Sequence, residues 1–241
     1  MIGATELKKI FLILLAVSLV FIISACSSTY QNKDPITKDG KEFDVVFKNF
    51  DGSVLKTEKV NEGDTANPPI GLKRDGYKFV KWDKSFDNVT KDVVVKAVYE
   101  EITEPTLIVD TVYSKGEDVV VKVSVKNNPG TLTMLLNTIY VENAMELTKI
   151  ESGKAMKGYS FVAPKKLSNA CNAAWYINDV PDKITDGEIA LLHFKLNKNV
   201  APGAYEISIS CDNGAFGSNY EEIQFDIING YVVIENEEET K

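Results

Sequence analysis

Short stretches of alternating apolar and polar residues, separated by turn residues, constrain most strongly what this 241-residue chain can fold into. In EDVVVKVSVKNNPG, Val119, Val121, Val123 and Val125 fall on one face of a strand, and NNPG follows as a turn. Further strands are expected at NAAWYIND, GEIALLHFKLN, GAYEISIS and GYVVIEN, and no long helical period lies between them. The pattern predicts an all-β chain whose residues 106–235 form an antiparallel β-sandwich.

Residues 42–100 are expected to form a smaller module. FDVVFKNFDGSVLKTEKV is read as two strands joined by an Asp51-Gly52 turn, and an aromatic strand and an alternating strand follow. The residues that characterise the segment are Val46, Phe47, Asp51, Gly52, Val54, Val60, Gly63, Pro68, Gly76, Tyr77, Phe79, Trp82, Val89, Asp92, Ala97, Val98 and Tyr99. In these residues it resembles the internalin B-repeat (Listeria–Bacteroides repeat) family, which implies a β-grasp-like fold and a spacer or adhesion role. The chain departs from that family at Lys81, where Gly usually precedes the Trp.

Two aromatic residues of this module, Tyr77 and Trp82, allow two interpretations. They form either a platform for stacking sugars or part of the core of a small module. An acidic joint, EEITEP at 100–105, then leads to the sandwich, and Pro105 stiffens it.

The N-terminal residues predict export. Lys8 and Lys9 precede an apolar run from Ile10 to Ile23, which is typical of a signal peptide and short for a membrane span. ISAC resembles the lipobox of bacterial lipoproteins, which implies that residues 1–25 are removed and that Cys26 carries a diacylglycerol. Two acyl chains would hold the protein on the extracellular face of the cell membrane, with residues 26–41 as a polar tether. The alternative is an ordinary cleaved signal with an incidental cysteine.

Composition excludes some partners and leaves the cysteines open. The formal net charge is −8 and there is no basic patch, so nucleic acid is not expected as a partner. In an exported protein Cys171 and Cys211 form a disulfide or remain buried thiols. With His193 as the only histidine, no metal site is expected. Residues 236–241 belong to an acidic, solvated tail.

Residues 106–235 contain an ordered set of short motifs: Lys115-Gly116, the Val119–Val125 alternation, KNNPG, the strand ending at Tyr140, Leu147, Glu151-Ser152-Gly153, Trp175, DGEIALLHFKL, PGAYEISIS and NGYVVIE. In these pieces and in their order the segment resembles a cohesin, the receptor domain of cellulosome scaffoldins and a jelly-roll sandwich. Thr138, the two cysteines and FVAPKKLSNAC depart from the family pattern. The resemblance implies binding to dockerins, calcium-loaded helical modules borne on enzymes, with the calcium on the dockerin and no cofactor on this chain.

The stretch TMLLNTIY carries large aliphatic side chains on both faces of a strand, so that something should cover Leu135 and Ile139. Under the resemblance, a dockerin covers them. Leu191, His193 and Lys195 are expected on a strand of the same binding sheet, while Trp175 points inward. The expected dockerin face is Leu135, Asn137, Ile139, Ala174, Tyr176, Leu191, His193 and Lys195. The alternative is that a loop, a neighbouring strand or the first module covers these residues. His193 either tunes binding with pH or is an ordinary solvated residue.

The expected function is a lipid-anchored, non-catalytic surface protein that docks dockerin-bearing proteins, with polysaccharide-degrading glycoside hydrolases as the expected partners. One histidine and no GxSxG motif argue against nucleophilic catalysis, although acidic residues are too numerous to exclude a carboxylate pair by count. The alternatives are a carbohydrate-binding or adhesive lipoprotein and, less well matched in length, a solute-binding lipoprotein.

Overall fold

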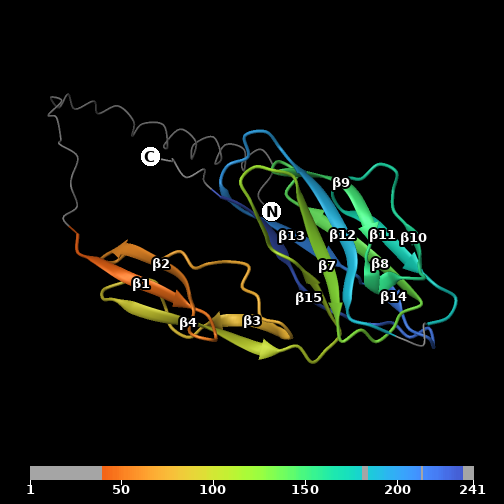
Figure 1. The fold of residues 1–241 in the computed structure, drawn as a ribbon, viewed down its shortest axis with the longest axis horizontal. Coiled ribbons are helices and arrows are strands. Elements are labelled where there is room, and N and C mark those ends of the chain that lie inside the picture. Colours follow the sequence, from red (N-terminus) through yellow and green to blue (C-terminus); the bar gives the residue numbers. More distant parts are fainter. Residues whose placement is uncertain (1–39, 181–183, 213, 236–241) are drawn as a thin grey trace, which may run out of the picture. The chain divides into compact units, whose positions relative to one another are not determined.

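The computed structural model describes residues 40–180, 184–212 and 214–235 (Figure 1). These residues form sixteen strands and one turn of 3-10 helix, Lys154–Met156, so the all-β prediction is confirmed. No helix among them is long and apolar enough to cross a membrane. The predictions for the signal peptide, for Cys26, for most of the tether and for residues 236–241 lie outside the described residues.

The module that follows residue 41 is a four-stranded sheet in the order β2-β1-β4-β3. Its first and last strands, β1 and β4, are parallel neighbours at the centre, and an antiparallel strand lies outside each. The predicted hairpin turn is present, because Gly52 has a φ of 86° and the Asn49 N–H donates to the Ser53 carbonyl over 2.8 Å. The strands are β1 (Glu42–Lys48), β2 (Val54–Asn61), β3 (Tyr77–Trp82) and β4 (Val93–Glu101).

The module has its own hydrophobic core. Val45, Phe47 and Val95 are fully buried, and the Phe47 ring meets the edges of Trp82 and Phe86 with centroids 5.0 and 5.3 Å apart. A bulge between Phe79 and Lys81 shifts the register of β3 on β4.

Two sheets follow, which pack as the predicted sandwich. One sheet has the order β15-β5-β7-β12-β9, with bounds β15 (Asp226–Ile228), β5 (Thr106–Val109), β7 (Val119–Lys126), β12 (Gly187–Leu196) and β9 (Met145–Ser152). The other has the order β10-β11-β8-β13-β16-β6, with β14 also paired to β8. Its bounds are β10 (Ser160–Val162), β11 (Cys171–Tyr176), β8 (Thr133–Tyr140), β13 (Gly203–Ser210), β14 (Ala215–Phe216), β16 (Gly230–Ile234) and β6 (Val112–Ser114).

The core between the sheets is built by the predicted period of two. Val121, Val123 and Val125 of β7 are buried, as are alternate residues of β12 from Ala190 to Leu196. Trp175 points inward as expected, is 1% exposed, and donates from Nε1 to the Ser152 Oγ over 2.9 Å. A buried indole with a satisfied N–H stabilises the sandwich by both packing and hydrogen bonding.

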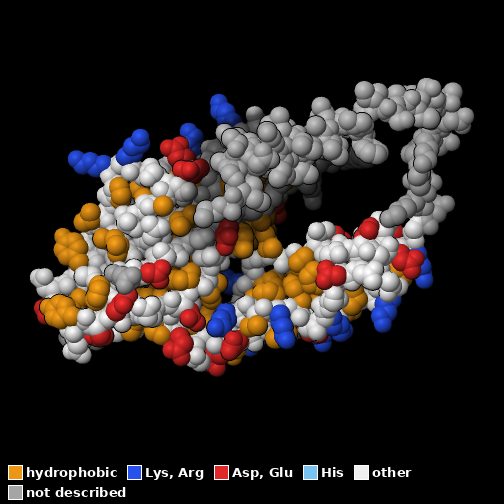
Figure 2. All heavy atoms as spheres, turned by 180° about the vertical axis from the view of Figure 1, so that it is seen from behind, with side chains coloured by type: hydrophobic (Ala, Val, Ile, Leu, Met, Phe, Trp, Pro, Cys, Tyr) orange, Lys and Arg blue, Asp and Glu red, His pale blue; other side chains and the backbone are white. Residues whose placement is uncertain are grey.

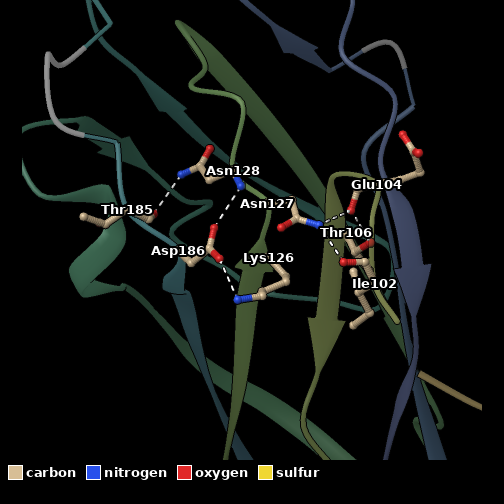
Figure 3. A network of polar contacts seen from close by, with 8 residues as sticks. All are labelled: Ile102, Glu104, Thr106, Lys126, Asn127, Asn128, Thr185 and Asp186. Carbon is tan, nitrogen blue, oxygen red and sulfur yellow. Dashed lines mark hydrogen bonds and ion pairs between the residues drawn. The ribbon is translucent and has the colours of Figure 1, made fainter. Parts of the chain in front are cut away.

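A polar network fixes the turn between β7 and β8 (Figure 3). The Asn128 N–H donates to the Asp186 carboxylate over 2.9 Å, and Lys126 Nζ lies 3.1 Å from the same carboxylate. The Asn127 amide donates to the carbonyls of Ile102 and Glu104, and so holds the segment that enters β5. The NNPG stretch therefore makes a turn and also provides anchors for two other segments.

Candidate partner-binding face

The strand β8 carries its apolar side chains on both faces, as its sequence indicates. Met134, Leu136 and Tyr140 are buried between the sheets, whereas Leu135 is 41% exposed and Ile139 is 44% exposed. A loop passes beside Leu135, whose N–H donates to the Gly214 carbonyl over 2.8 Å. That loop leaves the side chain accessible, so within the described residues neither a loop nor a strand covers this face.

The neighbouring strand β11 extends the exposed surface. Ala174 pairs with Leu135, and Tyr176 pairs with Thr133. Tyr176 is 50% exposed, so the outward orientation expected for Ala174 and Tyr176 is confirmed. On the other side of β11, Val162 of β10 lies opposite Ala174 and is 54% exposed. The sequence did not indicate Val162, because a three-residue strand is too short to show an alternation.

A pair of asparagines lies between the two exposed aliphatic residues of β8. The Asn137 Nδ2 donates to the Asn172 Oδ1 over 2.9 Å and to the Ala170 carbonyl over 3.1 Å. On the other side of β8, Ser210 of β13 pairs with Asn137, and Ser208 pairs with Ile139. Hydrogen-bonding groups are therefore set within an apolar surface, which is typical of a protein interface.

Charged residues are missing from these strands. β8, β10 and β11 contain no Asp, Glu, Lys or Arg, and β13 contains only Glu206. We call the outward side chains of β10, β11, β8 and residues 207–210 the uncharged face: Thr133, Leu135, Asn137, Ile139, Ser160, Val162, Asn172, Ala174, Tyr176, Ser208 and Ser210. Figure 2 shows one side of the sandwich, where hydrophobic side chains lie among uncharged and acidic ones.

Three residues expected on this face belong to the opposite sheet. Leu191, His193 and Lys195 do point outward from β12, but β12 pairs with β7 and β9, and the prediction that it shares a sheet with β8 is wrong. The physical reason is that a period of two tells which side of a strand faces the core and does not tell which sheet the strand joins. One flat partner surface cannot touch β8 and β12 together, because the sandwich core separates them.

The outward surface around β12 is charged. Lys149 and Glu151 of β9 form an ion pair, and the His193 Nε2 lies 3.6 Å from the Glu151 Oε2. The hydrogen bond from Lys149 lowers the pKa of the Glu151 carboxyl from its ordinary value. β7 adds Lys122 and Lys126 to this surface. The two outward faces of the sandwich therefore differ in chemistry.

The cysteines flank β8 without meeting. Cys171 of β11 pairs with Thr138, while Cys211 follows β13 on the other side of β8, and both are buried, free thiols. A strand lies between them, so their backbones are about 10 Å apart, beyond the reach of a disulfide. The alternative of buried thiols is therefore the one the structure favours. Burial raises the pKa of the Cys211 thiol to about 11, which makes it a poor nucleophile.

Tyr77 and Trp82 do not form a flat platform. Trp82 packs against Phe47 at 64° and Phe79 at 62°, and the Arg74 guanidinium lies 3.5 Å from the centre of the Tyr77 ring. Sugar stacking needs an open ring face, so this geometry favours core packing. Among residues 40–180, 184–212 and 214–235, no group of three or more His, Cys, Asp or Glu side chains is arranged to hold a metal ion.

Comparison with known proteins finds similarity at the level of solved structures. No family model matches the chain, and a search of curated proteins finds no match. The sixth cohesin of Acetivibrio cellulolyticus scaffoldin B, solved with a mutant Cel5 dockerin, is 23% identical, with a TM-score of 0.48 over 55% of this chain and 100% of that chain.

Two further cohesins are similar. A non-cellulosomal cohesin from the archaeon Archaeoglobus fulgidus is 17% identical over 57% of this chain and 95% of that chain, with a TM-score of 0.47. The OlpA cohesin of Clostridium thermocellum, solved as a type I complex with the dockerin Doc918, is 19% identical over 55% of this chain and 100% of that chain, with a TM-score of 0.46.

Proposed function

We propose that the sandwich is a non-catalytic receptor that docks dockerin-bearing proteins through the uncharged face. The observation that carries the proposal is the exposure of Leu135 and Ile139 on a strand whose inward side chains are fully packed. The sequence resemblance to cohesins supplies the kind of partner. Exposed aliphatic side chains on one face do not stabilise a monomer. Burial of these side chains under a partner would favour formation of the complex.

The exposed apolar side chains of the uncharged face are large enough to supply much of the binding free energy of a complex with a partner. Complete burial of an aliphatic side chain is worth about 1.5–3 kcal/mol. Leu135, Ile139, Val162 and Tyr176 are each at least two-fifths exposed, so each has apolar area left to bury. The central pair, Leu135 and Ile139, is expected to act as the hot spot, with the hydrogen-bonding Asn137 between them.

We propose further that Cys26 carries the lipid anchor and that the receptor is displayed on the extracellular face of the cell membrane. The support is the lipobox resemblance in ISAC. The partners would be polysaccharide-degrading enzymes, with calcium on the dockerin, and the module of residues 42–100 would act as a spacer. Mass spectrometry of the membrane fraction should find a diacylglycerol on Cys26, and Cys26→Ser should release the protein into the medium. Recovery of unmodified Cys26 would contradict the anchor.

Docking can be tested by calorimetry with residues 27–241 and calcium-loaded dockerins encoded in the same genome. Binding is expected for the parent and should be lost with Leu135→Lys and with Ile139→Lys. Val120→Lys is the matched control, since Val120 is 45% exposed on the outward side of β7 in the opposite sheet. This control should bind as the parent does, and circular dichroism should show that all variants are folded.

The same titrations distinguish the alternative functions. Soluble glucans and xylans are titrated in parallel, because Tyr176 is an exposed aromatic on the uncharged face. If a glycan binds and no dockerin does, the proposed receptor function is wrong and the chain is a carbohydrate-binding protein. Equal loss of dockerin binding in Val120→Lys and Leu135→Lys would mean that the partner does not use the uncharged face.

A further inference from the structure

Side chains on the uncharged face fall into rows that run across the strands, and the rows differ in polarity. The strand registers place Asn172, Asn137 and Ser210 side by side across β11, β8 and β13. Leu135 lies on one side of this polar row and Ile139 on the other. A partner that lies along β8 therefore meets an apolar, a polar and again an apolar position.

The orientation of the Asn137 amide is fixed by its partners. A backbone carbonyl can only accept, so the Asn137 atom 3.1 Å from the Ala170 carbonyl must be the donor Nδ2. The same Nδ2 donates to Asn172. Among the described residues nothing donates to the Asn137 Oδ1, which remains an acceptor on the outward side of β8.

The absence of charge around this polar row limits the charge that a partner surface can carry where it covers the row. A charged side chain brought onto the centre of this surface would lose its water and find no opposite charge on β8, β10 or β11. The one charged side chain of β13, Glu206, lies two residues beyond Ser208 and accepts a hydrogen bond from the Asn229 amide. Burying an unpaired charge costs more than a buried aliphatic side chain gains. The face therefore selects against charged partner surfaces as well as for apolar ones. The outward face of the opposite sheet carries lysines and glutamates, so it does not select against charged partner surfaces.

We infer that the partner surface is itself uncharged: a helix with apolar side chains over Leu135 and Ile139 and a neutral donor, a hydroxyl or amide, at the Asn137 Oδ1. This inference rests on the proposed docking function. Two residues along a strand span about 6.7 Å. Four residues along a helix rise about 6 Å, so apolar, donor and apolar side chains at intervals of four residues match the three positions of β8.

The expected consequence is binding with little salt dependence. Calorimetry with the calcium-loaded dockerin that binds residues 27–241 would compare the dissociation constant at about 0.05 and 0.5 M NaCl, where screening lengths differ several-fold. A change of less than about twofold is expected, whereas an interface held by ion pairs would weaken by about tenfold or more. Asn137→Ala should weaken binding about tenfold, the equivalent of one hydrogen bond.

The control for Asn137→Ala is Ser124→Ala, which removes an outward polar group from β7 in the opposite sheet and should leave the affinity unchanged. Tenfold weakening by salt, in a complex that Leu135→Lys still abolishes, would overturn this inference and leave the docking function intact. Full affinity in Asn137→Ala would do the same. If no dockerin binds, the docking function and this inference both fail.

Discussion

Thr138 of β8 lies directly opposite Cys171 of β11, and both side chains are buried between the two sheets. The Thr138 Oγ1 has no hydrogen-bond partner among the described residues. A buried hydroxyl without a partner costs free energy, because water bonds it in the unfolded chain and nothing bonds it in the core.

Thr138→Val is therefore expected to raise the free energy of unfolding by about 1–2 kcal/mol, since it removes the unpaired hydroxyl and keeps the shape. Thr106→Val is the matched control. Thr106 is also buried, but its Oγ1 donates to the Glu104 carbonyl over 2.8 Å, so this variant should be less stable than the parent. Urea denaturation of both variants measures the difference. Destabilisation by Thr138→Val would mean that its hydroxyl is bonded in solution.

The cysteines give a second prediction. Residues 27–241 should contain two free thiols, Cys171 and Cys211, and reducing agent should leave the urea midpoint unchanged. Iodoacetamide at pH 8 should label neither thiol in the folded protein, because both are buried and the pKa of Cys211 is about 11. Mass spectrometry after denaturation without reductant would show a loss of 2 Da if a disulfide were present.

The sequence predicted the sandwich and the orientation of β8 and β11, because alternation reports burial directly. Leu135, Ile139 and Tyr176 were found in this way. The sequence could not show which sheet β12 joins, because the neighbours of a strand depend on backbone pairing between distant segments of the chain. For the same reason it could not tell that β8 separates the two cysteines.

A third prediction concerns Gly153, which comes directly after β9. Its N–H donates to the Ile189 carbonyl over 2.8 Å, and an added Cβ would lie 2.5 Å from the Glu188 carbonyl carbon and closer to its oxygen. Backbone atoms of a paired strand cannot move aside cheaply. Gly153→Ala should therefore lower the free energy of unfolding by about 1–3 kcal/mol, the cost of overpacking, as measured in urea.

Gly217→Ala is the control for Gly153→Ala. The three heavy atoms nearest to an added Cβ there all belong to the Glu221 carboxyl group, which can move aside at the cost of one exposed hydrogen bond from the Asn219 N–H, so a smaller loss is expected. Equal losses in the two variants would show that the close backbone approach at Gly153 is not what forbids a side chain.

The Asp186 network gives a prediction for acid stability. Burial would raise the pKa of the Asp186 carboxyl, but the Asn128 N–H and the Lys126 ammonium outweigh it and hold the pKa below its ordinary value. A lowered pKa stabilises the fold above the unfolded pKa of about 3.9, and this contribution is lost as the pH falls through the folded pKa. Asp186→Asn should therefore be less stable than the parent at pH 7, by about 0.5–1 kcal/mol because the side chain is partly exposed.

This difference between Asp186→Asn and the parent should shrink toward zero as the pH approaches 2, because both proteins then carry a neutral side chain at this position. Urea denaturation from pH 2 to pH 7 measures it. Glu117→Gln is the control, because it neutralises a carboxylate that has no hydrogen-bond or ion-pair partner among the described residues, and its stability at pH 7 should match the parent's within about 0.5 kcal/mol. A constant gap between Asp186→Asn and the parent at every pH would mean that the variant disturbs the β7–β8 turn itself, and that the ionised carboxylate contributes little.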